Sequence, residues 1–254
     1  MLTENIEAHV MRPKISLITP TRNRADLLIR TIKNLQLQSL QNWQMVVVDD
    51  GDGTGMKAAQ SLNDARVLAV ANAGSGQVDA RNQAIDLAGA DLIHLLDDDD
   101  RWFDAAHLEK VIAVLSNQKG LLYRGGWLAL EDQLESGWNE RERRLFDPVT
   151  TGKSLRRDNT LLTSGVAYPK VLHQELGMFD PQMGNYWDWD WWLRATSQYP
   201  LLNLPEPAVL MSWRGSNTSR DPLEPGRVEY LQRLRKKHGL GVIVSKNHAT
   251  VLWA

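Results

Sequence analysis

Four consecutive aspartates, Asp97 to Asp100, directly follow the apolar run of residues 92–96. Like charges held close together repel, so such a run is tolerable beside a buried strand when a cation lies among the carboxylates. If the strand continues, its side chains alternate, and Asp97 and Asp99 face one ion. Carboxylate oxygens are hard ligands, which favours Mg²⁺ or Mn²⁺. The alternative is that these acids precede a helix predicted at residues 105–116 and interact with its dipole.

Polar clusters also follow three earlier apolar runs, each of strand length. In an open parallel sheet, ligands bind at the carboxyl ends of the strands, so we expect these clusters to share one edge. The runs and their clusters are residues 15–19 with Thr19-Pro20-Thr21-Arg22-Asn23-Arg24, residues 45–48 with Asp49-Asp50-Gly51-Asp52, and residues 67–70 with Asn72 and the glycines that lead to Arg81.

Helical spacing of apolar residues separates these strands, as at Leu28, Ile32 and Leu35. Strand alternating with helix predicts an α/β fold, a three-layer α/β/α sandwich with a mostly parallel central sheet. After Tyr123 the rhythm weakens, and residues 131–144 predict a loop or an antiparallel excursion. The predicted helices are 25–40, 56–63, 77–88, 105–116, 188–198 and a basic helix at 228–238, and the later strands are 163–168 and 208–213.

Composition excludes several classes of protein. The 254 residues include no cysteine, which excludes a disulfide scaffold, a thiolate metal site and a cysteine nucleophile. A net charge of -2 argues against a nucleic-acid partner recruited by bulk charge. No apolar run approaches the roughly 18 residues of a membrane span, so we expect a soluble, cytoplasmic protein. Gly152-Lys153-Ser154 lacks the first glycine of a phosphate-binding loop, because residue 147 is Asp.

The motifs together resemble family 2 glycosyltransferases of the GT-A fold. The resemblance covers residues 14–125 and resumes at residues 187–194, in the order known for that family. The residues that carry it are Pro20-Thr21-Arg22-Asn23-Arg24, Val47-Val48-Asp49-Asp50-Gly51, Ala80-Arg81-Asn82, Leu96-Asp97-Asp98-Asp99-Asp100 and Trp187-Asp188-Trp189-Asp190-Trp191-Trp192-Leu193-Arg194.

The resemblance implies inverting, metal-dependent transfer of a sugar from a UDP-, dTDP- or GDP-linked donor to a hydroxyl of a glycan or lipid-linked acceptor. It implies a tail at 1–13, a nucleotide-sugar-binding half at 14–125, an acceptor half at 126–220 and a helical tail at 221–254. Asp97 and Asp99 resemble the D-x-D pair that holds Mn²⁺ or Mg²⁺. The residues implied to bind the donor are Thr19, Arg22, Asp49 or Asp50, Arg81, Asp98 and Arg214.

Asp188 aligns with the family's catalytic base. Neighbouring tryptophans are expected to shield it from water and raise its pKa toward neutrality. Asp190 is the second candidate for the base and is also expected among the residues of the acceptor site, although two positions along a helix it points away from Asp188. The sequence departs from the family in two places: Trp187 replaces a glutamate, and residues 212–217 contain no histidine, which leaves Arg214 as a diphosphate partner.

Two features have open interpretations. The chain holds ten tryptophans, and Trp187, Trp189 and Trp213 are either core residues or a platform for an acceptor sugar. The basic segment 227–238 is either a solvated amphipathic helix or a peripheral contact with anionic lipid. Two alternative functions also remain open at this point: a sugar-phosphate nucleotidyltransferase, and an inactive nucleotide- or sugar-binding relic of the fold.

Overall fold

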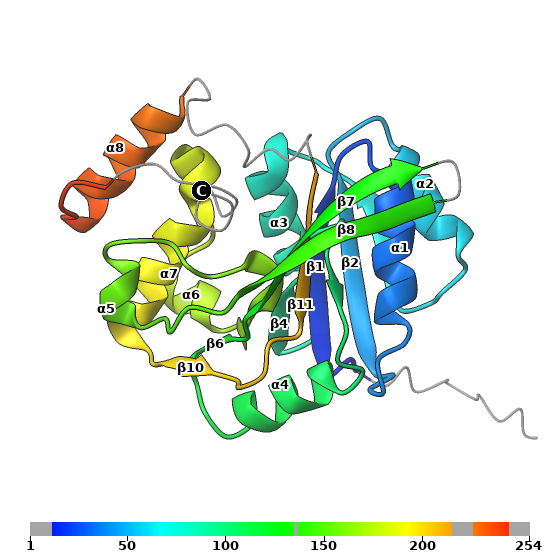
Figure 1. Cartoon of the computed structure of the whole chain (residues 1–254), viewed down its shortest axis with the longest axis horizontal. Coiled ribbons are helices and arrows are strands. Elements are labelled where there is room, and N and C mark those ends of the chain that lie inside the picture. The colour runs from blue at the N-terminus through cyan, green and yellow to red at the C-terminus, as the bar shows by residue number, and fades with distance from the viewer. Residues whose placement is uncertain (1–11, 135–136, 215–225, 244–254) are drawn as a thin grey trace, which may run out of the picture.

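A seven-stranded sheet forms the centre of the computed structural model, in the order β10-β6-β9-β4-β1-β2-β3 (Figure 1). β1 (Ile15–Thr21) pairs in parallel with β2 (Trp43–Asp49) and β4 (Leu92–Leu95), and β3 (Val67–Ala71) pairs in parallel with β2. Every residue of β1 is buried, as expected of a strand covered on both faces. The structure describes residues 12–134, 137–214 and 226–243.

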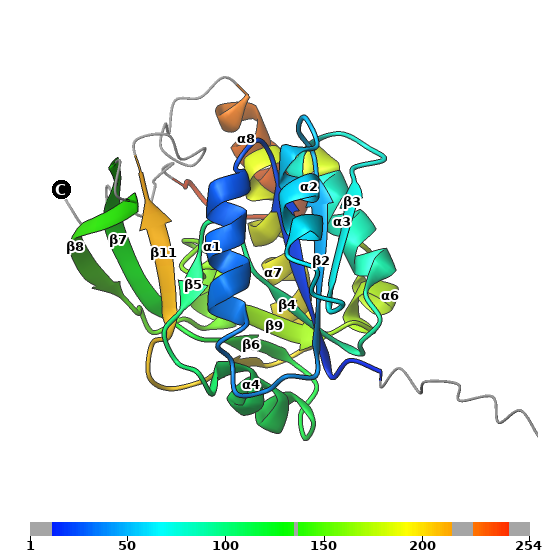
Figure 2. The ribbon, with the colours of Figure 1, turned by 90° about the vertical axis from the view of Figure 1, so that its right-hand side faces the viewer.

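Helices cover both faces of this sheet. Figure 2 shows α1 (Ala25–Leu35) on one side, and α3 (Gly76–Leu87) and α6 (Leu172–Leu176) on the other. The predicted three-layer α/β fold is therefore confirmed. α2 (Thr54–Ser61) packs against α1 and β3.

The first helix ends earlier than the predicted residue 40. After α1, the Gln38 side chain is buried, where its Nε2 donates to the carbonyl of Asp104 at 2.9 Å and its Oε1 accepts from the Leu108 amide at 3.1 Å. These tertiary hydrogen bonds draw the chain out of the helix, which local periodicity does not reveal.

One strand of the sheet runs against the rest. β9 (Val166–Pro169) lies between β4 and β6 (Leu121–Tyr123) and is antiparallel to both, whereas β10 (Leu201–Asn203) is parallel to β6. The strand predicted at residues 163–168 begins only at Val166, because a 3₁₀ turn, η1 (Thr163–Gly165), precedes it.

A smaller sheet of order β5-β11-β7-β8 accounts for the predicted antiparallel excursion. β7 (Gly126–Leu134) and β8 (Gly137–Phe146) form its hairpin, β11 (Val209–Trp213) runs parallel to β7, and β5 (Arg101–Trp102) pairs with β11. The buried carboxylate of Glu131 in β7 accepts hydrogen bonds from Arg101 of β5 and Ser212 of β11, which hold the small sheet together, and from Arg30 of α1, which joins this sheet to the rest of the molecule.

The remaining helices of the described ranges are α4 (His107–Leu115), α5 (Gly152–Leu155), the 3₁₀ helix η2 (Pro181–Tyr186), α7 (Trp187–Gln198) and α8 (Arg227–His238). α8 packs on η2 and α7. Across the described ranges, none of the helices combines the length and apolar character that crossing a bilayer requires.

A chain of buried polar groups joins β4, α4 and β6. The Arg124 guanidinium donates to Nδ1 of His107 at 3.1 Å, Nε2 of His107 lies 2.8 Å from Nε2 of His94, and Nδ1 of His94 donates to the carbonyl of Leu95 at 2.7 Å. These hydrogen bonds can all form only when both imidazoles are neutral, because each ring then donates through one nitrogen and accepts through the other. Burial accordingly lowers the pKa of His94 to about 4 and places that of His107 well below its usual range.

Folding stability is expected to fall with acidification because of this chain. Unfolded histidine takes up its proton below about pH 6.5, whereas folded His94 does so only near pH 4, so the free energy of unfolding decreases as pH drops through that window. At pH 5 the loss from His94 alone is about 2 kcal/mol. Urea unfolding at a series of pH values from 7 to 5 measures this loss in the free energy of unfolding. His94→Gln, which can make both hydrogen bonds without titrating, should show a shallower decline, and an unchanged slope would contradict this assignment.

Candidate active site

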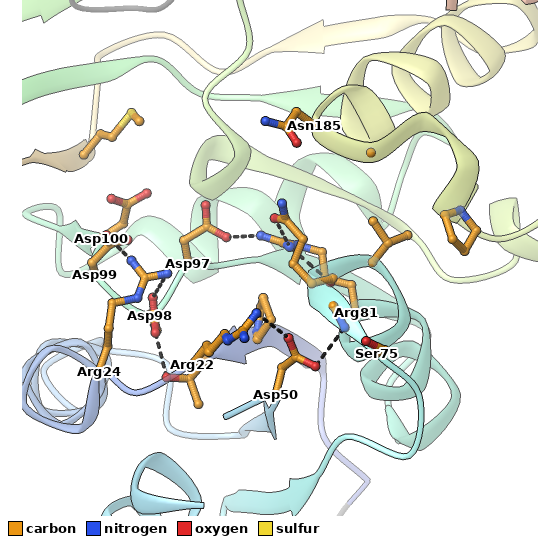
Figure 3. Close-up of a pocket in the computed structure, with 18 of the residues that line it drawn as sticks. Arg22, Arg24, Asp50, Ser75, Arg81, Asp97, Asp98, Asp99, Asp100 and Asn185 are labelled. Atoms are coloured by element: carbon orange, nitrogen blue, oxygen red, sulfur yellow. Dashed lines mark hydrogen bonds and ion pairs between the residues drawn. The ribbon is translucent and has the colours of Figure 1, made fainter. Parts of the chain in front are cut away.

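A cavity of about 410 Å³ opens at the carboxyl ends of β1, β2 and β4 (Figure 3). Polar loops predicted to share one edge of the sheet do meet there. The cavity is lined by loops at the ends of the strands and by later elements. The lining residues include Thr21 at the end of β1, Arg22 and Arg24 after it, Asp50 after β2, residues 75–78 at the start of α3 with Arg81, Asp97 to Asp100 after β4, and Asn185, Met211 and Tyr230 from the later elements.

Asp50 forms one end of the cavity. Its Oδ1 accepts from Asn72 Nδ2 at 2.7 Å and from the Gly76 amide at 2.8 Å, while its Oδ2 lies 3.8 Å from the exposed guanidinium of Arg22. One carboxylate oxygen is thus fixed by the protein and the other faces the cavity, available to an N–H donor.

The loop that carries Asp50 depends on Gly51. A Cβ on Gly51 would lie 2.9 Å from the backbone nitrogen of Asn23, so no larger residue fits without moving the loop after β1. Asn23 itself has a positive φ of 54° and its side-chain oxygen accepts from the Asp52 amide at 2.9 Å. The loops after β1 and β2 therefore hold each other in place.

The four aspartates form the opposite wall, in a tight turn. The amide of Asp100 donates to the carbonyl of Asp97 at 3.2 Å, so the strand does not continue and the predicted alternation of Asp97 and Asp99 is wrong. Thr31 stabilises the turn, with its hydroxyl 3.0 Å and 2.9 Å from the carbonyls of Asp98 and Asp100. The alternative, a place in the first turn of the following helix, is not adopted either, because α4 begins only at His107.

The aspartates of the turn have partners from several elements. Asp97, the most exposed with 31% of its side chain accessible, pairs with Arg81. Asp98 accepts from the Thr21 hydroxyl at 2.6 Å. Asp99 pairs with Arg214 and, at 2.9 Å, with Arg24. Asp100 accepts from the Ser164 hydroxyl at 2.6 Å and from the Ser212 amide at 3.2 Å.

The turn holds more buried negative charge than its arginines compensate. Burial, reinforced by the charge of Asp99, raises the pKa of Asp98 to about 7. Burial also raises the pKa of Asp99, and raises that of Asp100 well above its usual range. Among the residues that the structure describes, none donates a hydrogen bond to Oδ1 of Asp98, and the contact of this oxygen is the Arg24 guanidinium at 3.2 Å. An added hard cation would relieve this repulsion, so the donor set fits such an ion.

Asp188, at the start of α7, lies beside the cavity rather than in its wall. Its Oδ2 accepts from Asn159 Nδ2 at 2.9 Å and its Oδ1 from the Trp189 amide at 2.6 Å. Burial raises the pKa of Asp188 to about 6, the direction expected of a shielded base. The charge of Arg81 acts to lower this pKa and the charge of Asp97 acts to raise it. These two charges connect Asp188 electrostatically with the cavity.

Two residues expected to bind the nucleotide are structural instead. The Thr19 side chain is fully buried and donates to the carbonyl of Leu96 at 2.7 Å, joining β1 to the aspartate turn. Asp49 accepts from the amides of Gly51 and Met56, both at 2.8 Å, and so fixes the start of α2. Of the pair Asp49 and Asp50, only Asp50 faces the cavity.

The three tryptophans considered as an acceptor platform are core residues. Trp187, Trp189 and Trp213 are 4%, 3% and 8% exposed, and none contributes to the walls of the cavity. Trp189 Nε1 donates to the carbonyl of Leu155 at 2.7 Å. Trp187 does reach the site indirectly, because the Arg81 guanidinium stacks on its ring at 4.2 Å.

Asp190 points away from Asp188, as its helical position predicts, and holds α8 in place. Its fully buried carboxylate accepts from Arg194 Nε at 2.9 Å and lies 2.8 Å from both Lys237 Nζ and His238 Nε2. Burial alone would raise its pKa, but the hydrogen bonds from His238 and Lys237 lower it to about 2. Its place in this network does not fit an acceptor contact.

Sequence reasoning missed Asn185 and Tyr230, which line the cavity from η2 and α8 (Figure 3 labels Asn185). The position of Tyr230 follows from close packing of α8 on η2, because a Cβ on Gly184 would lie 2.4 Å from the Tyr230 ring. No local pattern marks either residue. Arg24 lay within the motif after β1 but was not singled out.

The chain has the GT-A glycosyltransferase fold, as the comparisons with solved structures show. It superposes on Staphylococcus aureus TarS 1–349 in complex with UDP-GlcNAc with a TM-score of 0.63 at 16% identity, covering 88% of this chain and 66% of that one. It matches the mannosyltransferase PcManGT from Pyrobaculum calidifontis, in complex with GDP-Man and Mn²⁺, with a TM-score of 0.63 at 19% identity, covering 90% and 64%. At these identities the likeness is one of fold.

The chain belongs to glycosyl transferase family 2, and it is a glycosyltransferase. The family model of that description matches residues 16–166. The uncharacterized glycosyltransferase YwdF of Bacillus subtilis is 33% identical over 243 residues, 94% of this chain and 89% of YwdF. The Escherichia coli UDP-Glc:alpha-D-GlcNAc-diphosphoundecaprenol beta-1,3-glucosyltransferase WfgD is 32% identical over 113 residues, 43% of this chain and 44% of WfgD.

Removing the Asp190 carboxylate should release α8. Asp190→Ala leaves Arg194 and Lys237 without their buried partner, so the free energy of unfolding should fall by about 3 kcal/mol and amide exchange in α8 should accelerate. Asp180→Asn is the matched control, because it removes the other, partly exposed carboxylate partner of Lys237 while its amide oxygen can still accept from the Gln182 amide and cap η2, and it should cost less than about 1 kcal/mol. Equal effects of the two variants in urea unfolding would contradict the assigned role.

Proposed function

We propose that this enzyme transfers a sugar, with inversion, from a nucleotide-diphosphate donor bound in the cavity of Figure 3 to a hydroxyl acceptor. The observation that carries the proposal is the opposition of Asp50 and the aspartate turn across one cavity. Asp50 Oδ2 would accept an N–H of the base, and Arg22 and Arg81 would approach the phosphates. Residues 14–125 would then serve the donor and residues 126–220 the acceptor.

A divalent cation, Mn²⁺ or Mg²⁺, would be held by Asp97 and Asp99, with Asp98 beside them and Arg214 neutralising Asp99. No three His, Cys, Asp or Glu side chains of the described ranges are arranged as a complete metal site, so the diphosphate would supply further ligands. The bound ion would stabilise the charge that develops on the departing diphosphate. The Mn²⁺ and GDP-Man bound by PcManGT support this assignment.

Asp188 would act as the general base. As the acceptor oxygen forms its bond to the anomeric carbon, the bond from that carbon to the diphosphate breaks and the hydroxyl proton passes to Asp188. A pKa of about 6 leaves the carboxylate ionised at neutral pH yet more basic than an exposed aspartate. Asn159 would orient the carboxylate.

The acceptor is proposed to be a lipid-linked or other glycan precursor of a polysaccharide. The support is the name of WfgD, which describes transfer of glucose to GlcNAc on diphosphoundecaprenol. The core placement of the tryptophans leaves the wall of Asn185, Met211 and Tyr230 as the surface nearest the donor cavity from the later elements.

Calorimetric titration with UDP, dTDP and GDP, each with and without Mn²⁺, tests the donor site. One nucleotide should bind in a Mn²⁺-dependent manner. Asp50→Asn should weaken it about tenfold, as expected when a charged hydrogen-bond acceptor is lost, while preserving the dependence on Mn²⁺. Asp99→Asn should remove that dependence. If no nucleotide binds with or without the ion, the chain is a relic of its fold and the proposal is wrong.

Asp188→Asn should lower sugar transfer by about a thousandfold without weakening donor binding, because a base contributes to the chemical step alone. In the unmodified enzyme, kcat/KM should rise with pH through about 6, since Asp188 must lose its proton to work. Asp158→Asn, next to Asn159 in sequence, is the control and should retain turnover. Full activity of Asp188→Asn would place the base elsewhere.

A further inference from the structure

Basic side chains from α5, from the turn that follows it and from α8 gather at one end of the molecule. Arg156 joins them, because its Nη2 donates to the carbonyls of His238 at 3.0 Å and of Gly239 at 3.3 Å, at the end of α8. Figure 1 shows α5 and α8 on the same side, next to α7. The set, called here the α5–α8 face, comprises Lys153, Arg156 and Arg157 with Arg235, Lys236 and Lys237.

Much of this positive charge is not compensated. Lys237 pairs with Asp180 and Asp190, but no ion pair connects Lys153, Arg157 or Lys236 with a carboxylate in the ranges that the structure describes. All three of those side chains belong to exposed residues. The face therefore presents cations to solvent rather than to the protein.

Two apolar side chains flank the cations. Val149 and Val242 are 92% and 87% exposed, the highest values among the large hydrophobic residues of the described chain. Val149 precedes α5 by three positions and Val242 follows Gly239 by three, and three residues span at most about 10 Å. Cations flanked by exposed apolar groups suit the boundary of an anionic bilayer, where both kinds of contact add.

The structure also limits how such a contact forms. Leu231 and Leu234 of α8 are buried against the protein, and Val228, 58% exposed, is the large aliphatic side chain that the helix leaves open. A single valine is no apolar face that could insert into lipid. A contact of the α5–α8 face with lipid is instead electrostatic, at the level of the headgroups, with the two valines as shallow anchors.

We infer that the α5–α8 face docks this enzyme on an anionic lipid surface. The inference rests on the proposed lipid-linked acceptor and explains how such a substrate reaches the site. Asn159, two residues beyond Arg157, donates to Asp188, and Tyr230 at the other end of α8 lines the donor cavity. Docking through this face would place the edge of the active site next to the membrane.

Co-sedimentation with vesicles tests the inference. The full chain should bind vesicles that contain phosphatidylglycerol but not vesicles of phosphatidylcholine alone, and added salt should release it. Each basic residue near an anionic surface contributes about fivefold in binding, so Lys153→Gln/Arg157→Gln should weaken partitioning about twenty-five-fold. This pair leaves Arg156 and its contact with α8 intact. Val149→Ser should weaken binding by a smaller factor.

The matched control is Arg141→Gln/Arg143→Gln on the exposed strand β8, which removes the same charge elsewhere. It should leave vesicle binding within about twofold of the unmodified chain. Equal loss in both double variants, or no binding of the unmodified chain to phosphatidylglycerol vesicles, would overturn the inference. Donor titration of the unmodified chain separates the two proposals: no nucleotide binding together with intact vesicle binding would sink the proposed function alone. The variants Lys153→Gln/Arg157→Gln should bind the nucleotide as the unmodified chain does, because neither residue lines the cavity.

Discussion

The burial of four adjacent carboxylates in one turn is the constraint on which the rest of the site depends. Burial and mutual repulsion raise the pKa values of Asp98, Asp99 and Asp100, so the turn is costly unless other groups compensate it. The groups that compensate the carboxylates come from elements that are far apart in sequence: Thr21, Arg24, Arg81, Ser164, Ser212 and Arg214. Thr31 holds the backbone of the turn instead, through the carbonyls of Asp98 and Asp100.

This requirement explains why the small sheet is fixed so firmly to the large one. β11 supplies Ser212 and leads to Arg214, so any displacement of this strand would expose the aspartates to uncompensated repulsion. Glu131 prevents such displacement from the neighbouring strand, since it bonds at once to Ser212, to Arg30 of α1 and to Arg101 of β5. The hairpin thus supports the aspartate turn without lining the cavity.

Sequence reasoning predicted the α/β fold and the polar loops at the carboxyl ends of the strands, because both depend on local pattern and strand order. It left Asp49 and Asp50 as alternatives, and of the two only Asp50 lines the cavity. The geometry of the aspartates was mispredicted, because Thr31 and Ser164 shape the turn through contacts over more than sixty positions. Tyr230 was missed for a related reason: its position depends on how α8 is held by the ion pair of Asp190 with Lys237 and packed against Gly184. Trp187, Trp189 and Trp213 are core residues, the first of the two interpretations that the sequence left open, since nearby apolar elements enclose them.

The central claim is that the aspartate turn holds the cation that binds the donor's diphosphate. Crystals grown with UDP and Mn²⁺, or with whichever nucleotide binds, would test it through the anomalous scattering of manganese. The account predicts one strong peak within coordination distance of Asp97 or Asp99, with the nucleotide base at Asp50 and the diphosphate between them. A nucleotide bound at Asp50 with no peak at the turn, or a peak at another group of carboxylates, would contradict it.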